Sequence, residues 1–447
     1  EVASFRPSRP EDRQAVMGQT EAILARRSTL GDSAAALFET LALVSDATRQ
    51  AMRVSAWAEL QADEDLRVTE TQERRQLAQV MFTRLNEATA WIQPEILRVG
   101  AETIDSFVRE DPRLARFAHQ LDDTLRNAPH TLGDEAEQTL AYLTPAFGAP
   151  GTIYGLVAAS DIPWPTVTLA SGEEALIDGQ GYARHRGSAN REDRKLVYDA
   201  YWSKWLEYRN SVGAILNSHL QTQAALAKAR NYESVLHREL FQDNLPPEVY
   251  RTLVAEVNAA LPTLHRYFRL RGRMLGVDQM RYYDIYPPLV ALDKKFDFAT
   301  SKDITLDAMA VLGDDWVELQ RDAMSQRWMH VYPQRGKQMG AYMQPAAYDV
   351  HPYLLLNHND DYNSLTTMAH EWGHAMHSLY SKQSQPFDTA FYATFIAEIP
   401  STSLELILQD HMKSIAASDA ERLFYLGSAL ESFRLNFFRQ TMFAEFE

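Results

Sequence analysis

Apolar side chains recur every three to four residues along most of the chain, which is the spacing of one face of an α-helix. Residues 13–127 keep this pattern with few Pro or Gly interruptions, and they predict helical hairpins. The pattern returns over residues 192–230 and 247–275, and about the last ninety residues are largely helical again. We therefore expect a mainly α protein.

Pro and Gly residues interrupt the helical pattern from Pro145 to Pro165, between two helical blocks. We expect the helix to break there, and a short β-hairpin to follow from residues 166–169 and 175–177. This suggests two domains, an N-terminal helical lobe of residues 1–145 and a second helical region of residues 146–447. Residues 421–447 predict an amphipathic helix without a closing Gly, Asn or Pro, which is compatible with a chain truncated at its C-terminus.

Composition excludes several classes of function. The chain has 44 Lys and Arg against 60 Asp and Glu, a net charge of −16, so we expect no nucleic-acid partner. It has no Cys, so any metal must bind to His, Asp or Glu. The sequence contains no run of about 18 apolar residues, so it predicts no membrane span. Because no signal peptide is visible, we expect a cytoplasmic protein. The alternative is a periplasmic or secreted protein, because the chain has no Cys and its first residue is Glu1 rather than Met.

The strongest chemical signal is the segment His370-Glu371-Trp372-Gly373-His374. Residues four apart lie one above the other on an α-helix, so both imidazoles can bind one Zn²⁺. Glu371 projects from the edge of the same face, where it can take a proton from a water on the metal without being a ligand. The pattern is typical of a metallopeptidase.

The surrounding residues predict a helix with one buried face. Asn363 or Ser364 can cap a helix that begins at Leu365 and ends near Ser381. Its apolar stripe lies away from both histidines, so one face can pack on the core while the other faces a cleft. This stripe consists of Leu365, Met368, Ala369, Trp372, Met376 and Leu379. The alternative is that His370 and His374 are ordinary structural histidines.

A second helix, expected from about Thr389, can supply a third ligand. His374 and Glu398 lie at similar distances from the turn between the helices, so they meet in an antiparallel hairpin. We expect Glu398 to complete a His₂Glu zinc site with one open position, and Pro400 to perturb the helix just after it. Glu405 is its competitor, and we expect it to orient a ligand histidine instead.

His377 shares the face of the two histidines. A third ligand one turn further along a straight helix would strain tetrahedral geometry. We therefore expect His377 to line the cleft or support a ligand rather than to bind the metal.

These segments resemble a known family. His370-Glu-Trp-Gly-His374-Ala-Met-His377 followed by Phe395-Ile-Ala-Glu398-Ile-Pro-Ser401 is similar to the thimet oligopeptidase and oligoendopeptidase F family of zinc peptidases, closest to bacterial oligoendopeptidase F. The similarity extends to three upstream segments, which are Tyr332-Pro-Gln-Arg-Gly-Lys337 with Gly340-Ala-Tyr342, Tyr348-Asp-Val-His351-Pro-Tyr353, and Leu354-Leu-Leu-Asn357.

The resemblance implies a two-lobed helical clam with a deep channel and a small β element near the active site. It implies that residues 354–357 form an edge strand that pairs with the substrate backbone. It also implies substrate contacts from Gly340, Tyr342, His351, Tyr353, Leu355 and Asn357. The family continues beyond this point with His and Tyr groups that stabilise the oxyanion, and no matching segment follows Glu405 in this sequence.

The sequence thus predicts a zinc-dependent endopeptidase that cleaves internal bonds of short oligopeptides, with one Zn²⁺ per chain and a zinc-bound water, activated by Glu371, as nucleophile. Two alternatives remain. One is a dipeptidyl carboxypeptidase of the angiotensin-converting type, and the other is a non-catalytic zinc-containing peptide-binding protein. The pattern predicts no oligomeric state.

Overall fold

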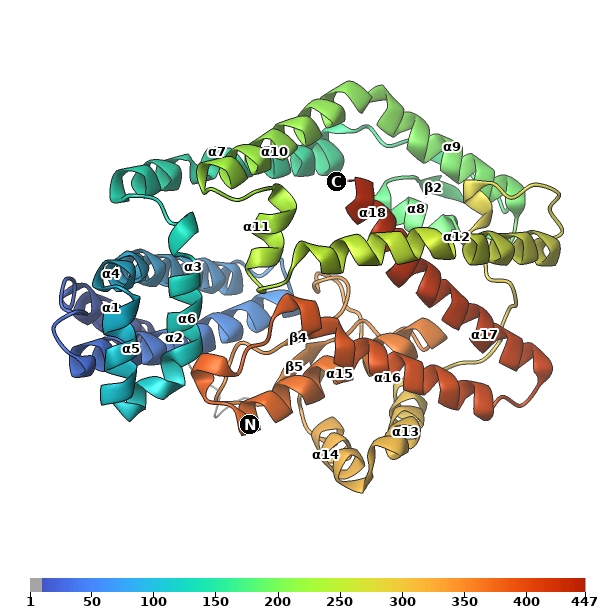
Figure 1. Cartoon of the computed structure of the whole chain (residues 1–447). Coiled ribbons are helices and arrows are strands. Elements are labelled where there is room, and N and C mark those ends of the chain that lie inside the picture. Colours follow the sequence, from blue (N-terminus) through green and yellow to red (C-terminus); the bar gives the residue numbers. More distant parts are fainter. Residues whose placement is uncertain (1–9, 447) are drawn as a thin grey trace. The chain divides into compact units, whose positions relative to one another are not determined.

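The computed structural model describes residues 10–446, and helices dominate it (Figure 1). The mainly α prediction is confirmed. The chain forms two compact units, of which the first comprises the chain up to residue 131 with residues 293–414, and the second comprises residues 132–292 with 415 to the end. Each unit is discontinuous in sequence, and the division into residues 1–145 and 146–447 stays a prediction. None of the helices within residues 10–446 combines the length and apolar character needed to cross a bilayer.

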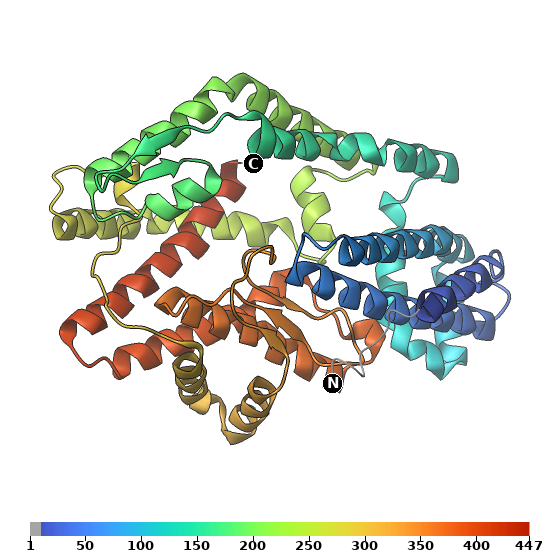
Figure 2. The same cartoon turned by 180° about the vertical axis from the view of Figure 1, so that it is seen from behind.

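The first unit begins with a helical bundle. Its three long helices pack against one another in both views (Figures 1 and 2). Ser33 caps the longest of them by accepting a hydrogen bond from the Ala36 N–H, and Leu37 and Leu41 are buried one turn apart on its inner face. The helices of this part are α1 (Pro10–Leu24), α2 (Ala34–Glu64), α3 (Thr69–Thr89), α4 (Ile92–Val99), α5 (Ala101–Glu110) and α6 (Ala118–Arg126).

The later part of this unit combines four helices with a small sheet. The helices are α13 (Phe298–Ala308), α14 (Asp314–Ser325), α15 (Tyr362–Ser384) and α16 (Thr394–Ser414), and the strands are β3 (Met329–His330), β4 (Tyr342–Gln344) and β5 (Tyr353–Leu355).

The order of the three strands corrects one expectation. Strand β5 lies between β3, to which it is parallel, and β4, to which it is antiparallel. The prediction that residues 354–357 form an edge strand is therefore wrong. Both sides of β5 already have backbone partners, and the neighbouring edge strand is β4.

The second unit contains α7 (Asp134–Leu156), α8 (Gly179–His185), α9 (Arg191–Glu207), α10 (Arg209–Ala229), α11 (Val235–Phe241), α12 (Pro247–Leu275), α17 (Asp419–Phe433) and α18 (Gln440–Phe446). Strands β1 (Thr166–Thr168) and β2 (Glu174–Leu176) pair antiparallel, which confirms the predicted hairpin. The expected helix break from Pro145 is wrong, because α7 continues to Leu156 while packing on α10. The predicted terminal helix appears as α17, a π-helical turn (Arg434–Arg439) and α18, and its last residue, Glu447, lies outside the described residues.

Candidate metal centre

Helix α15 carries the His-Glu-x-x-His segment. It begins at Tyr362, earlier than expected, because the Asp361 side chain accepts a hydrogen bond from the Ser364 N–H at 2.7 Å. The cap predicted at Asn363 or Ser364 is thus wrong, and the Ser364 hydroxyl instead accepts from the Asn359 N–H at 2.9 Å. The predicted stripe is buried except at Leu379, which is partly exposed. This packing fixes the rotation of the helix and leaves the histidines on another face.

Helix α16 lies alongside α15 (Figure 1), as predicted, although it begins at Thr394 rather than about Thr389. The two helices approach closely at Gly373, where an added Cβ would lie 2.5 Å from the Ser401 Cα and 2.8 Å from the Pro400 carbonyl oxygen. Pro400 lies within α16, so the helix continues through it. Because Gly373 precedes His374 directly, this contact brings Glu398 to the two histidines.

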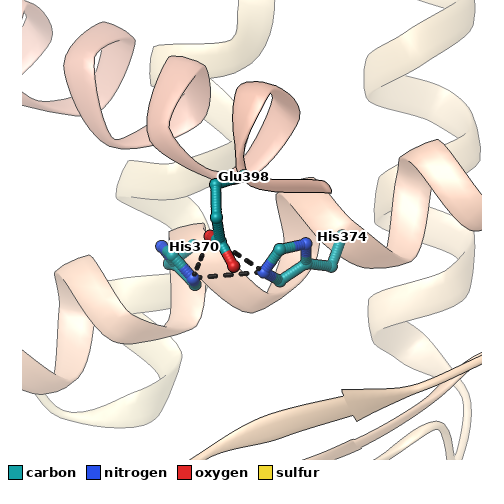
Figure 3. A group of neighbouring side chains, drawn as sticks. All are labelled: His370, His374 and Glu398. Atoms are coloured by element: carbon teal, nitrogen blue, oxygen red, sulfur yellow. Dashed lines mark hydrogen bonds and ion pairs between the residues drawn. The ribbon is translucent and has the colours of Figure 1, made fainter. Parts of the chain in front are cut away.

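The side chains of His370, His374 and Glu398 point toward one another (Figure 3). The Nε2 atoms of His370 and His374 are 3.2 Å apart. The Glu398 Oε2 lies 3.3 Å from the His370 Nε2 and 3.4 Å from the His374 Nε2. Four tetrahedral ligands about 2.0–2.1 Å from a zinc ion are about 3.3–3.4 Å from one another. The three atoms therefore have the spacing of one face of a zinc coordination tetrahedron.

Two neighbouring side chains hold this arrangement. Glu405 Oε1 lies 2.5 Å from His370 Nδ1, which favours a proton on Nδ1 and directs the Nε2 lone pair toward the other two ligand atoms. Burial disfavours a charged His370, but Glu405, together with the charges of Glu371 and Glu398, outweighs burial and raises the pKa of His370. The Ser401 hydroxyl donates to Glu398 Oε2 at 2.7 Å and restrains its otherwise exposed side chain. Glu405 thus lies where the sequence placed it, against a predicted ligand.

Glu371 lies beside the three ligand atoms but outside their cluster. Its side chain is buried, and burial is the main cause that raises its pKa to about 7. The backbone N–H of Met343, in the middle of β4, faces this carboxylate and lowers its pKa in part. A buried carboxylate next to a metal site can exchange protons near neutral pH.

His377 lies outside the cluster, in keeping with the expectation that it is not a ligand. Its ring stacks on Tyr392 with centroids 3.9 Å apart, and burial lowers its pKa. Its Nδ1 is buried and has no hydrogen-bond partner among the described residues. A supporting role for His377 stays a prediction.

The six residues expected to contact substrate belong to the sheet and its loops. The Tyr342 hydroxyl donates to Asp63 Oδ2 at 2.7 Å. Leu355 is buried in the central strand. The Asn357 side chain donates to the carbonyls of Gln338, at 3.0 Å, and Gly340, at 2.7 Å, and so fixes the loop before β4.

The other two residues, His351 and Tyr353, form an aromatic stack. The His351 ring lies flat on Trp328, with centroids 4.3 Å apart, and also contacts the ring of Tyr353. These contacts order the sheet and its loops, while a direct contact of any of the six with substrate stays a prediction.

The sequence did not predict the roles of three residues at this site. Gly373 carries the helix contact, Ser401 orients Glu398, and the Met343 N–H faces Glu371. A signal existed only for Gly373, because a glycine inside a strong helical pattern costs about 1 kcal/mol relative to alanine and so suggests a packing constraint. The other two act through a hydroxyl and a backbone N–H, which follow no sequence pattern.

Comparison with known proteins agrees with this geometry. The profile of Peptidase family M3 matches residues 185–447, more than half of the chain, and that of Oligopeptidase F matches residues 95–163. The chain belongs to peptidase family M3. The M3 family consists of metallopeptidases, and the His-His-Glu cluster lies within the matched region.

Individual M3 relatives resemble the chain along nearly all of its length. The oligopeptidase PepF of Bacillus subtilis is 32% identical over 94% of this chain and 63% of its own. A crystal structure from Chlamydophila abortus has a TM-score of 0.85 at 28% identity, and it covers 97% of this chain and 74% of that one. The oligoendopeptidase F of Enterococcus faecium has a TM-score of 0.70 at 26% identity, and the match covers 100% of this chain and 74% of that one. The chain thus spans a little under two thirds of the length of PepF.

Proposed function

We propose that this chain is a zinc-dependent endopeptidase that hydrolyses internal bonds of short oligopeptides. The observation that supports this best is the cluster of His370, His374 and Glu398, whose three ligand atoms lie 3.2–3.4 Å apart beside the buried carboxylate of Glu371. Two imidazole nitrogens and one carboxylate oxygen are the ligand set of catalytic zinc peptidases, which leave a fourth position open.

The donor atoms favour zinc over harder ions. Mg²⁺ and Ca²⁺ take oxygen ligands in six or more positions, whereas this cluster offers two nitrogens at tetrahedral spacing. When bound there, zinc would supply a Lewis acid that polarises the scissile carbonyl and acidifies water. His370, held by Glu405, and His374 would each present Nε2 to the ion, and Glu398 would be restrained by Ser401.

We assign the proton transfer to Glu371. It lies one residue after His370 on the same helix, and its carboxylate is buried rather than part of the ligand cluster. In the proposed reaction it accepts a proton from the attacking water and passes the proton to the nitrogen of the departing amine. One carboxylate then serves both halves of the hydrolysis.

The substrate backbone would pair with β4. This strand is an edge of the small sheet, and an extended peptide can add to such an edge through main-chain hydrogen bonds, here through the Met343 C=O because the Met343 N–H faces Glu371. Because the recognition uses the backbone, sequence preference would be weak. Family resemblance and strand addition together suggest flexible peptides of roughly five to twenty residues, with folded proteins resistant.

The test is digestion of a ladder of peptides of increasing length, in free and C-terminally amidated forms, beside a stable folded domain, followed by mass spectrometry. The proposal expects internal cleavage of free and amidated peptides, loss of cleavage in Glu371→Gln, and an intact folded domain. Strict release of C-terminal dipeptides only from free peptides would indicate a dipeptidyl carboxypeptidase. Peptide binding without turnover by the zinc-loaded chain would indicate a binding protein.

A further inference from the structure

Two carboxylates of helix α2 hold the edge strand that borders Glu371. We propose that Glu59 and Asp63 are positioning residues that fix β4 through the side chains of Gln344 and Tyr342, and thereby place the Met343 backbone N–H against the Glu371 carboxylate. The inference rests on the proposed function in that it assigns Glu371 the proton transfer. It adds a device, outside the metal-binding helices, that keeps this carboxylate in place.

The hydrogen-bond pattern of the sheet defines which side of β4 is open. The N–H groups of Leu354 and Leu356 donate to the carbonyls of Trp328 and His330, so the alternate residues of β5 face β4. Those alternate residues are Tyr353 and Leu355, which pair with Gln344 and Tyr342. Met343, between the two, therefore directs its N–H and C=O away from β5, along the open edge.

The open edge of β4 borders the metal-binding helix. Helix α15 packs against β4, and the Met343 N–H on this edge faces the Glu371 carboxylate and lowers its pKa. A backbone N–H beside a carboxylate favours the charged form and the position in which the two groups face each other. Any displacement of β4 relative to α15 would therefore move or release the Glu371 side chain.

Two side-chain hydrogen bonds tie β4 to α2. The Tyr342 hydroxyl donates to Asp63 Oδ2 at 2.7 Å, and the Gln344 amide donates to Glu59 Oε2 at 3.0 Å. Residues i and i+2 of a strand share one face about 6.8 Å apart, and residues i and i+4 of a helix share one face about 6 Å apart. The two spacings match, so the two bonds form a clamp at either side of Met343.

The surroundings of the two carboxylates provide a control for the clamp. Asp63 also lies 3.4 Å from the Arg75 guanidinium, which partly neutralises the carboxylate pair on α2. Gln61, between the two acids, contacts a different element, since it accepts a hydrogen bond from Arg74 of α3 at 3.0 Å. Substitution of Gln61 therefore provides a matched control on the same helix.

The experiment compares the zinc-loaded chain of 447 residues with Glu59→Ala, Asp63→Ala and the double variant. Asp63→Asn is the conservative replacement, and Gln61→Ala is the control. Tyr342→Phe removes the same hydroxyl bond from the strand side while it keeps the ring. Amide hydrogen exchange is measured by mass spectrometry for peptides that contain Met343. Zinc content and the kcat and KM for a fluorogenic peptide are measured in parallel.

We expect exchange at Met343 to become about tenfold faster or more in the double variant, because each lost hydrogen bond loosens the strand. Zinc content should not change, since β4 supplies no ligand, while kcat falls about tenfold to a hundredfold through misplacement of Glu371. Asp63→Asn, which keeps an acceptor oxygen for Tyr342, should retain most of the kcat. Gln61→Ala should match the wild type in every measurement.

Unchanged exchange at Met343 in the double variant would overturn the inference, and so would a wild-type kcat despite faster exchange. Failure of the proposed function is distinguishable, because a zinc-loaded wild type that cleaves no peptide refutes that function. In that event the exchange measurement still decides whether α2 holds β4.

Discussion

Replacement of Gly373 by alanine tests whether backbone contact between α15 and α16 sets the spacing of the metal ligands. The alanine Cβ would lie 2.5 Å from the Ser401 Cα, whereas ordinary contact begins at 3.4 Å, so the helices must separate by about 0.9 Å. The three nearest atoms, the Ser401 Cα and N and the Pro400 carbonyl oxygen, all belong to the backbone, so no side chain can rotate away. Separation would move Glu398 from His374 by more than the roughly 0.2 Å that metal–ligand distances tolerate.

The expected cost has two parts. Overpacking should lower the free energy of unfolding by about 1–3 kcal/mol. The higher helix propensity of alanine should offset up to about 1 kcal/mol of this loss. Zinc affinity should fall at least about tenfold, as it does when ligand orientation is disturbed. Chelator competition measures the affinity, and denaturant unfolding of the metal-free chain measures the stability.

Gly213→Ala is the matched control. Gly213 is an exposed residue of α10, and an added Cβ would have nothing within 4 Å. The free energy of unfolding of this variant should therefore rise by up to about 1 kcal/mol, and the variant should bind zinc as the wild type does. If Gly373→Ala bound zinc with wild-type affinity, the proposed link between helix contact and ligand spacing would be refuted.

Two further predictions concern carboxylates, of which Glu405 is partly buried and Asp284 fully buried. Glu405→Ala should weaken zinc binding about 10–100-fold in a chelator titration, because it releases the Nδ1 of His370, and unchanged affinity would exclude an orienting role. Asp284, buried and paired with Arg191 and Arg194, should contribute about 3–5 kcal/mol at neutral pH, measured as the difference in unfolding free energy between wild type and Asp284→Asn. Burial disfavours the charged form of Asp284, but the two arginines outweigh burial and lower its pKa. The stabilisation is therefore fully present above the pKa of the unfolded state, about 3.9. It is lost as the pH falls through the lower pKa of the folded state. A difference that did not shrink between pH 7 and acid pH would contradict the assignment.

The sequence was sufficient for features that depend on periodicity. Helical spacing placed His370 and His374 on one face, and an equal count of residues on either side of a turn brought Glu398 to them. Local chemistry was less certain, since Asp361, Asn363 and Ser364 are all good caps and only the backbone conformation decides among them.

Strand order could not be predicted, because it depends on contacts between segments far apart in the chain. The run Leu354-Leu-Leu fits a central strand as well as an edge strand, and only its pairing with both β3 and β4 distinguishes them. The clamp from α2 is also non-local, since Asp63 and Tyr342 are 279 positions apart. Nothing in the sequence relates those two residues before the chain folds.

Zinc titration of the metal-free chain, with peptide cleavage followed at each point, tests the central claim most directly. We expect cleavage to rise to saturation at about one zinc per chain, Glu371→Gln to bind the same amount of zinc without restoring cleavage, and Glu398→Ala to bind it more weakly. Cleavage that persisted after verified removal of the metal would contradict the account. So would loss of zinc from Glu371→Gln while Glu398→Ala retained it.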